Sequence, residues 1–312
     1  MKKLLILCLV FPILIFAQEI KTEELDLKNG DISLPGTLTV APSKKKTPLV
    51  IFIQGSGNGD RNGNQAGTLM QIGYIKTLRD SLNAKGISFY SYDKRSANLN
   101  NLKSVKDISF KGFVDDANVA IDYFKNDKRF SGITIIGHSQ GSLVGMLAIN
   151  TRNDKAVASY ISLAGPGKTF DKTIVEQLTA QNPDLGKAAK EQFEELVQTD
   201  TIKEVNPLLM SVFQPVYQKF IKEWATENPA TEIKKLQIPV LILNGDADLQ
   251  VSTADAQLLK DAHPKATLKI IPKMNHVLKV VNSIVENQEA YTSKDYKISK
   301  ELINTIDKFV SK

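Results

Sequence analysis

The chain has 312 residues, of which 42% are hydrophobic and 24% are charged. This composition excludes a disordered or fibrous protein, and the length suits one large domain or two small ones. The formal net charge is +6, two units of which come from Lys2 and Lys3, and so small a surplus does not favour nucleic-acid binding.

The N-terminus predicts a secretory signal peptide. Two lysines precede an apolar run over residues 4–17, which is shorter than a membrane-spanning helix needs and ends in the small residue Ala17. We therefore expect residues 1–17 to be cleaved and the mature protein to be secreted or periplasmic, with no stable membrane span. A buried N-terminal helix or strand is the alternative.

The single cysteine, Cys8, lies inside this predicted signal. Leu7 precedes it where a lipoprotein signal would have a small residue, so lipid anchoring is not expected. Cleavage would leave a mature chain without a disulfide or a thiol nucleophile.

The first part of the mature chain predicts strands. Asn29-Gly30 between two apolar runs indicates a hairpin, and we place antiparallel strands over residues 20–41 at one edge of a sheet. A buried strand over residues 49–53 then runs into a glycine-rich loop, residues 54–63, where the backbone can approach a ligand closely. A dinucleotide-binding loop would need a glycine in place of Asp60 and a helix directly after it, and a purely structural loop is a further alternative.

Helices and strands alternate through the next hundred residues. Helical spacing covers 69–84 and 113–124, and strand-like runs cover 87–92 and 157–163. This alternation predicts a parallel sheet with helices on both faces, in which ligands bind at the carboxyl ends of the strands.

The most informative stretch is a buried strand, 133–136, that turns abruptly at Ser139 and continues as a helix. Gly137 and Gly141 lack the side chains that would collide in so tight a turn, and the backbone of Ser139 is expected to be strained. The helix that starts behind the turn offers the backbone N–H of Gln140 to an oxyanion formed at Ser139.

This G-x-S-x-G pattern, between a strand and a helix, resembles the nucleophile elbow of the α/β-hydrolases. The resemblance implies that Ser139 is the nucleophile of a mostly parallel α/β fold. It also implies that the loop after strand 49–53 supplies the second oxyanion donor, the N–H of Ser56 or of Gly57.

The segment from Lys168 to about Lys235 contains no strand-like run. Helix formers dominate 174–197, and a second helical stretch, 207–225, carries five large side chains: Met210, Phe213, Tyr217, Phe220 and Trp224. Such an insertion resembles the helical cap of the α/β-hydrolases, which roofs the pocket. We accordingly expect core segments over 18–163 and 236–312, with the cap over 164–235. Packing within the protein is sufficient to explain the presence of any one of the five side chains, but as a group they are expected to be partly exposed to the pocket.

The last strands complete the resemblance. A strand over 238–243 precedes two candidate acids, of which the family's spacing selects Asp248 over Asp246. A helix over 252–262 and a strand over 267–271 follow, and His276 comes next, in the chain order Ser, Asp, His expected for this fold.

The chain has only two other histidines. His138 adjoins the nucleophile, but its side chain should point away from that of Ser139, and we expect it to pack or to support the site. His263 is expected at the surface. A neutral imidazole can accept the serine proton near neutral pH, and a carboxylate can orient that imidazole, so Ser139, Asp248 and His276 form the predicted triad.

Charged residues follow the loops near the predicted site, and we expect Asp60, Arg61, Asp93 and Arg95 to form a salt-bridged scaffold. Asp93-Lys94-Arg95 resembles an acid-arginine-glycine turn of the family, although Ser96 replaces the glycine. Together with the motifs around Ser56, Asp248 and His276, these residues resemble secreted bacterial esterases and serine-aminopeptidase-like hydrolases.

The predicted function is therefore a secreted serine carboxylesterase that acts on a small ester and needs no metal or organic cofactor. An aminopeptidase acting on short peptides is the alternative, and it would need an acid such as Glu191, Glu194 or Glu195 to hold the substrate ammonium. A non-catalytic binding protein on the same fold is a third possibility. The sequence does not determine the oligomeric state.

Overall fold

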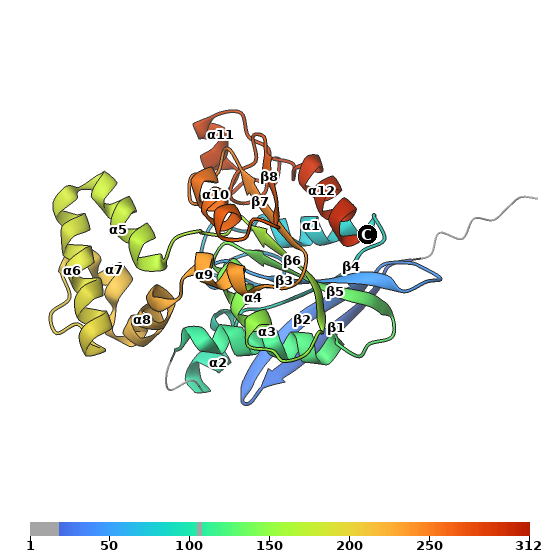
Figure 1. The fold of residues 1–312 in the computed structure, drawn as a ribbon, viewed down its shortest axis with the longest axis horizontal. Coiled ribbons are helices and arrows are strands. Elements are labelled where there is room, and N and C mark those ends of the chain that lie inside the picture. The colour runs from blue at the N-terminus through green and yellow to red at the C-terminus, as the bar shows by residue number, and fades with distance from the viewer. Residues whose placement is uncertain (1–18, 105–107) are drawn as a thin grey trace, which may run out of the picture.

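The structure is a computed structural model that describes residues 19–104 and 108–312, so the predicted signal peptide lies outside the described residues. One eight-stranded sheet crosses the molecule in the order β1-β2-β4-β3-β5-β6-β7-β8 (Figure 1). The strands are β1 (Lys21–Asn29), β2 (Ile32–Val40), β3 (Thr47–Ile53), β4 (Ser88–Tyr92), β5 (Phe130–His138), β6 (Val157–Leu163), β7 (Val240–Gly245) and β8 (Thr267–Ile271).

The sheet is mostly parallel. Strand β2 pairs antiparallel with both β1 and β4, and every pair from β4 to β8 is parallel. The hairpin between β1 and β2 turns at Gly30, whose φ of 57° is a left-handed value that glycine adopts easily. The predicted antiparallel edge is confirmed.

Helices cover both faces of the sheet. One buried cluster lies between the sheet and α3, α4, α9 and α10, and a second lies between the opposite face and α1 and α12. This layering confirms the predicted α/β-hydrolase architecture of a central sheet flanked by helices. The helices of the core are α1 (Tyr74–Asn83), α2 (Leu99–Ser104), α3 (Phe110–Phe124), α4 (Gln140–Asn150), α9 (Pro229–Lys235), α10 (Thr253–Ala262), α11 (Ile284–Glu289) and α12 (Lys300–Val310).

Helix α1 begins later than the sequence predicts. The apolar spacing suggested a start at Leu69, but Leu69 is 81% exposed and the helix starts at Tyr74. Gly73 precedes the helix with a φ of 60°, a left-handed conformation that cannot continue an α-helix towards the N-terminus.

The chain segment that connects β6 to β7 forms a group of helices that projects away from the sheet (Figure 1). Its four α-helices share a core of their own, which includes Phe193 and Phe213. The prolines at 207 and 215 open short 3₁₀ turns, so the second predicted helical stretch is broken into pieces. The helices are α5 (Phe170–Gln181), α6 (Pro183–Thr199), α7 (Met210–Phe213) and α8 (Gln218–Thr226).

Helix α9 differs from these four because it packs against α4 and α10 on the sheet. The proposed division at residues 164 and 235 stays a prediction. No helix among the described residues is long and apolar enough to cross a lipid bilayer.

Candidate active site

Ser139 occupies a strained turn between β5 and α4. Its φ and ψ are 53° and −123°, and its N–H donates to the carbonyl of Leu163 on β6 at 3.0 Å. The glycines around it are required by close packing: a Cβ on Gly137 would collide with the backbone of Gly141, and a Cβ on Gly141 would collide with the carbonyl of Ile53 on β3. The turn therefore holds Ser139 at the carboxyl end of the sheet.

Asp248 and His276 lie together, as the sequence predicts. His276 Nδ1 lies 2.8 Å from Asp248 Oδ2, and the two side chains are 6% and 0% exposed. Asp248 Oδ1 accepts the backbone N–H groups of Gln250, at 2.8 Å, and of Val251, at 3.0 Å. The carboxylate is fixed by three hydrogen bonds, so the ring is held with Nδ1 towards Asp248 and Nε2 turned away from it.

The competing acid and histidine have other surroundings. Asp246 Oδ1 accepts the N–H of Lys273, a residue with a φ of 58°, and so closes the turn after β8. His263 follows the last residue of α10 and is half-buried, so it is partly accessible at the surface. Burial, with a smaller contribution from Lys265, lowers its pKa.

His138 connects the elbow to the loop that carries His276. It is buried, and its Nε2 lies 2.9 Å from the backbone oxygen of His276 while its Nδ1 lies 3.3 Å from the hydroxyl of Tyr74. Since a carbonyl can only accept, Nε2 carries the proton and Nδ1 accepts from the Tyr74 hydroxyl. Burial lowers the pKa of His138 to about 3, so the ring is neutral and supports His276 from behind.

The glycine-rich loop after β3 reaches the nucleophile. A Cβ built on Gly55 would lie 3.1 Å from Ser139 Cβ, and Ser56 lines the same cavity as Ser139 and Gln140. Gly57, whose φ is 89°, faces the side chain of Gln65. Of the two predicted second oxyanion donors, Ser56 is the one whose residue borders the cavity.

The cavity at Ser139 has a volume of about 250 Å³ and largely apolar walls. Phe170 on α5 and Trp224 on α8 stack with ring centroids 3.7 Å apart, and both line it. Of the five large side chains singled out in the sequence, only Trp224 is among the lining residues; Phe213, for example, is buried in the core of the projecting helices.

The acids suggested for an aminopeptidase lie elsewhere. Glu191 and Glu194 face Lys187 and Lys190 on α6, and Glu195 accepts the N–H of Lys203. Among the described residues, no acidic side chain lines the cavity at Ser139.

The charged residues of the neighbouring loops pair with one another. Asp93 accepts two hydrogen bonds from the guanidinium of Arg61, both at 2.9 Å, and Arg95 donates two to the buried carboxylate of Asp116, at 2.6 and 2.7 Å. Asp60 accepts the N–H groups of Asn62 and Asn64. The Arg61–Asp93 pair fits the expected scaffold, whereas Arg95 pairs with Asp116 and Asp60 binds uncharged groups of its own loop.

Lys94 is the residue near the site that the sequence analysis did not single out. It is buried, and its Nζ donates to the carbonyl of Gly55 at 2.6 Å and to Gln140 Oε1 at 2.9 Å. A lysine between two ion-paired residues resembles a surface residue in the sequence. Its partners, Gly55 and Gln140, follow other strands, so no local sequence signal marks Lys94.

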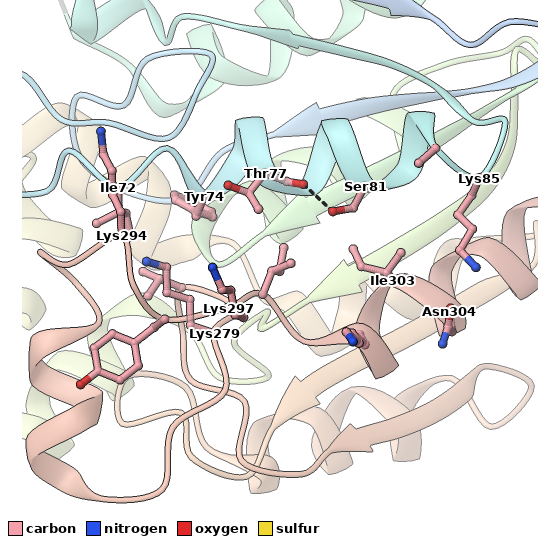
Figure 2. A pocket seen from close by; sticks show the side chains of 15 residues that line it. Ile72, Tyr74, Thr77, Ser81, Lys85, Lys279, Lys294, Lys297, Ile303 and Asn304 are labelled. Carbon is pink, nitrogen blue, oxygen red and sulfur yellow. Dashed lines mark hydrogen bonds between the residues drawn. The ribbon is translucent and has the colours of Figure 1, made fainter. Parts of the chain in front are cut away.

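A larger cavity, of about 850 Å³, lies between α1 and the segment that precedes α12 (Figure 2). Tyr74 and Val277 line it, so it adjoins the loop that carries His276. Its lining includes five lysines: Lys85, Lys279, Lys294, Lys297 and Lys300. Within residues 19–104 and 108–312, no group of three His, Cys, Asp or Glu side chains is arranged to hold a metal ion.

The mostly parallel sheet, the serine at a strained strand-to-helix turn and the acid and histidine after later strands define a hydrolase of the α/β-hydrolase superfamily. Comparison with family models places the chain more narrowly. It belongs to the BD-FAE family, whose model matches residues 38–262.

The individual proteins that match this chain have low sequence identity to it. Esterase EstD from Thermotoga maritima is 26% identical over 264 residues, a match that covers 82% of this chain and 60% of EstD. The chain thus spans about three fifths of the length of that curated relative.

Solved structures share the fold at low sequence identity. Est1E from Butyrivibrio proteoclasticus matches with a TM-score of 0.56 at 19% identity, covering 86% of this chain and 96% of Est1E. The Pyrococcus furiosus esterase Pf2001 matches with a TM-score of 0.55 at 15% identity, covering 95% and 91%. A proline iminopeptidase from Mycobacterium smegmatis gives 0.58 at 14%, covering 93% and 98%. At these identities the likeness establishes the fold alone.

Proposed function

We propose that this protein is a secreted serine carboxylesterase that hydrolyses small carboxylic esters through an acyl-enzyme on Ser139. The observation that carries the proposal is the buried 2.8 Å contact between His276 Nδ1 and Asp248 Oδ2, with His276 held against the elbow segment by His138. The esterase name of EstD, a relative that aligns with 82% of the chain, supports the same reaction.

The reaction proceeds in two halves. Ser139 Oγ attacks the ester carbonyl carbon while His276 Nε2 accepts the hydroxyl proton, and the carbonyl electron pair moves onto the oxygen. The tetrahedral intermediate then expels the alcohol oxygen, which takes the proton from His276. A water molecule then attacks the acyl carbon while His276 accepts one of its protons. The second tetrahedral intermediate breaks its bond to Ser139 Oγ, which takes that proton back from His276, and the carboxylic acid leaves.

The charge that develops on the carbonyl oxygen needs two aligned donors. The backbone N–H of Gln140, at the start of α4, is the first, and the N–H of Ser56 is the second, with Gly57 as the alternative. Removal of one such donor typically slows a hydrolase about 10²-fold to 10³-fold.

The surroundings of Ser139 favour a small ester over a peptide. A cavity of about 250 Å³ is smaller than most sites for drug-sized ligands, and its walls include Leu143, Phe170 and Trp224. An amine is a poorer leaving group than an alkoxide, and an aminopeptidase would in addition need an acid that the lining of this cavity lacks among the described residues.

The test is hydrolysis of p-nitrophenyl acetate and butyrate by the wild type, S139A and a matched variant, S81A. Ser81 is a half-buried serine on α1 whose hydroxyl donates to the carbonyl of Thr77, and it does not line the cavity at Ser139, so its replacement should leave the rate unchanged. S139A should lose nearly all activity and all labelling by a fluorophosphonate probe. Undiminished turnover in S139A would refute the proposal, and faster cleavage of an aminoacyl anilide than of the esters would favour the peptidase.

Secretion is the second part of the proposal. Its support is the run of two lysines and fourteen apolar residues, 4–17, before Gln18. Expression of the full chain in a bacterium, followed by mass spectrometry of the periplasm and the medium, should find a protein that begins at Gln18. Recovery of the uncleaved chain from the cytoplasm alone would contradict it.

A further inference from the structure

Lys94 follows β4, an interior strand of the sheet, two residues after that strand ends at Tyr92. Its backbone N–H donates to the carbonyl of Gly59 at 3.2 Å, which holds it against the glycine-rich loop after β3. Its side chain is buried beneath that loop and extends to the first residue of α4. Lysine is among the residues least often buried completely, so its position here calls for a reason.

Within the described part of the chain, the ammonium of Lys94 has polar partners but no carboxylate in contact. It donates to the Gly55 carbonyl at 2.6 Å and to Gln140 Oε1 at 2.9 Å, and it lies 4.7 Å from the centre of the Phe113 ring. The charged groups around it are Asp116 on α3 and Arg95, which is paired with Asp116 and faces the same ring. Burial lowers the pKa of Lys94 to about 7, against the opposing attraction of Asp116.

The two hydrogen bonds of the Lys94 ammonium reach the Gly55–Ser56 peptide group and the side chain of Gln140. Ser56 and Gln140 are the residues whose N–H groups are the proposed oxyanion donors. The carbonyl of Gly55 belongs to the same planar peptide group as the N–H of Ser56, and in a trans peptide the two bonds point in opposite directions. A carbonyl held towards Lys94 therefore turns the N–H of Ser56 the other way, away from the buried ammonium. Ser56 borders the cavity at Ser139, so this is the orientation that an oxyanion donor requires.

A charged donor also changes the strength of the peptide group that it binds. An ammonium at 2.6 Å from the Gly55 oxygen withdraws electron density through the amide, which makes the N–H of Ser56 a stronger donor in this buried setting. At the same time the bond to Gln140 Oε1 fixes the residue that supplies the other N–H.

We infer that Lys94 is the positioning residue of the oxyanion hole, because one buried ammonium orients the Gly55–Ser56 peptide and Gln140 together. The inference rests on the proposed esterase function and deepens it. Lys94 touches neither the substrate nor the reacting atoms. It acts through the two backbone donors, so it stabilises the transition state and contributes little to substrate binding.

The first test compares K94M with K279M on p-nitrophenyl butyrate. Lys279 is a matched control because it is also buried and its Nζ donates to a backbone carbonyl, that of Ser293, in the larger cavity (Figure 2). K94M should lower kcat by about 10-fold to 100-fold with KM within twofold, somewhat less than the loss of a donor itself. K279M should keep kcat within threefold, even where both variants lower the melting temperature.

A transition-state analogue gives an independent measure. A trifluoromethyl ketone forms an oxyanion on Ser139, so its inhibition constant for K94M should rise by the same factor as kcat/KM falls. An unchanged inhibition constant, a kcat within threefold of the wild type, or an effect confined to KM would overturn the inference.

The pH profile tests the charge itself, and it does not depend on K94M folding well. As pH rises through about 7, Lys94 loses its proton, so the kcat of the wild type should fall on the alkaline side. In D116N, which removes the nearby negative charge, this fall should move to lower pH. If the alkaline fall in kcat occurs at the same pH in D116N as in the wild type, the inferred role of the Lys94 charge is contradicted. If S139A is inactive while K94M is fully active, the inference about Lys94 is refuted and the esterase proposal stands. If S139A is active, the esterase proposal itself is refuted.

Discussion

The substitution D248N provides the sharpest test of the proposed triad, because the structure determines which way the new amide must face. Asp248 Oδ1 accepts two backbone N–H groups, those of Gln250 and Val251, at 2.8 and 3.0 Å. An amide NH₂ cannot replace an acceptor there, so the amide oxygen of D248N keeps that side. The NH₂ group is then forced into the position of Oδ2, facing His276 Nδ1.

This orientation gives His276 the wrong tautomer. With a donor facing it, Nδ1 must accept, and the ring proton moves to Nε2, which can then no longer accept the proton of Ser139. In other serine hydrolases of this kind, the loss of the correct tautomer lowers kcat about 10⁴-fold, which corresponds to about 5.4 kcal/mol in the activation free energy. Because the two backbone donors prevent the amide from flipping, we expect a loss of the same order in D248N.

The assay is kcat and KM for p-nitrophenyl butyrate at pH 7, with D246N as the matched control. Asp246 accepts the N–H of Lys273 and supports a turn, so D246N should lower thermal stability and keep most of the activity. Near-ultraviolet circular dichroism should report an intact fold for D248N. A loss of less than about 30-fold in D248N, or a larger loss in D246N, would mean that Asp248 does not orient the base.

Three further changes have defined outcomes. The pKa of His138 is depressed in the folded state, so below pH 6.5 the unfolded chain binds more protons than the folded chain. The free energy of unfolding should therefore fall as the pH drops, by up to about 1.4 kcal/mol per pH unit. In denaturant titrations, H138F should show a weaker dependence of this free energy on pH. G141A should abolish labelling by a fluorophosphonate and lower the melting temperature sharply, whereas G132A, whose added Cβ would meet only Ala158 at 3.1 Å, should do neither. W224A should shift the acyl-chain preference on p-nitrophenyl esters to longer chains, and Y217A, at an exposed position that does not line the cavity, should leave the preference unchanged.

Local sequence was sufficient where one segment determines its own structure. Gly137, Ser139 and Gly141 lie within five residues, and a Cβ on Gly137 would collide with the backbone of Gly141 in the same turn. The collision at Gly141 depends on the fold as well, because it involves the Ile53 carbonyl on the neighbouring strand β3. The hairpin at Gly30 was also predictable from local sequence. The start of α1 was not, because Leu69 continues the apolar spacing of the helix while Gly73 interrupts its backbone.

The cap residues were harder to predict because their surroundings are other cap residues. An aromatic side chain on an amphipathic helix has the same spacing whether it faces a cavity or a second helix. Phe213 is buried between helices of the projecting group, whereas Trp224 stacks on Phe170 and lines the cavity at Ser139. Phe170 itself lies at the first turn of α5, ahead of the helix formers that marked this segment in the sequence.

Lys94 could not be assigned a role from the sequence because its partners depend on the order of the strands. Strand β3 lies between β4 and β5, so the residues that follow these three strands, Gly55, Lys94 and Gln140, meet at one end of the sheet although up to 85 positions separate them. A lysine that looks solvated beside Asp93 in the sequence becomes buried once β4 pairs with β3. The same pairing brings the Lys94 ammonium to the Gly55 carbonyl and the Gln140 side chain, beside the proposed oxyanion donors.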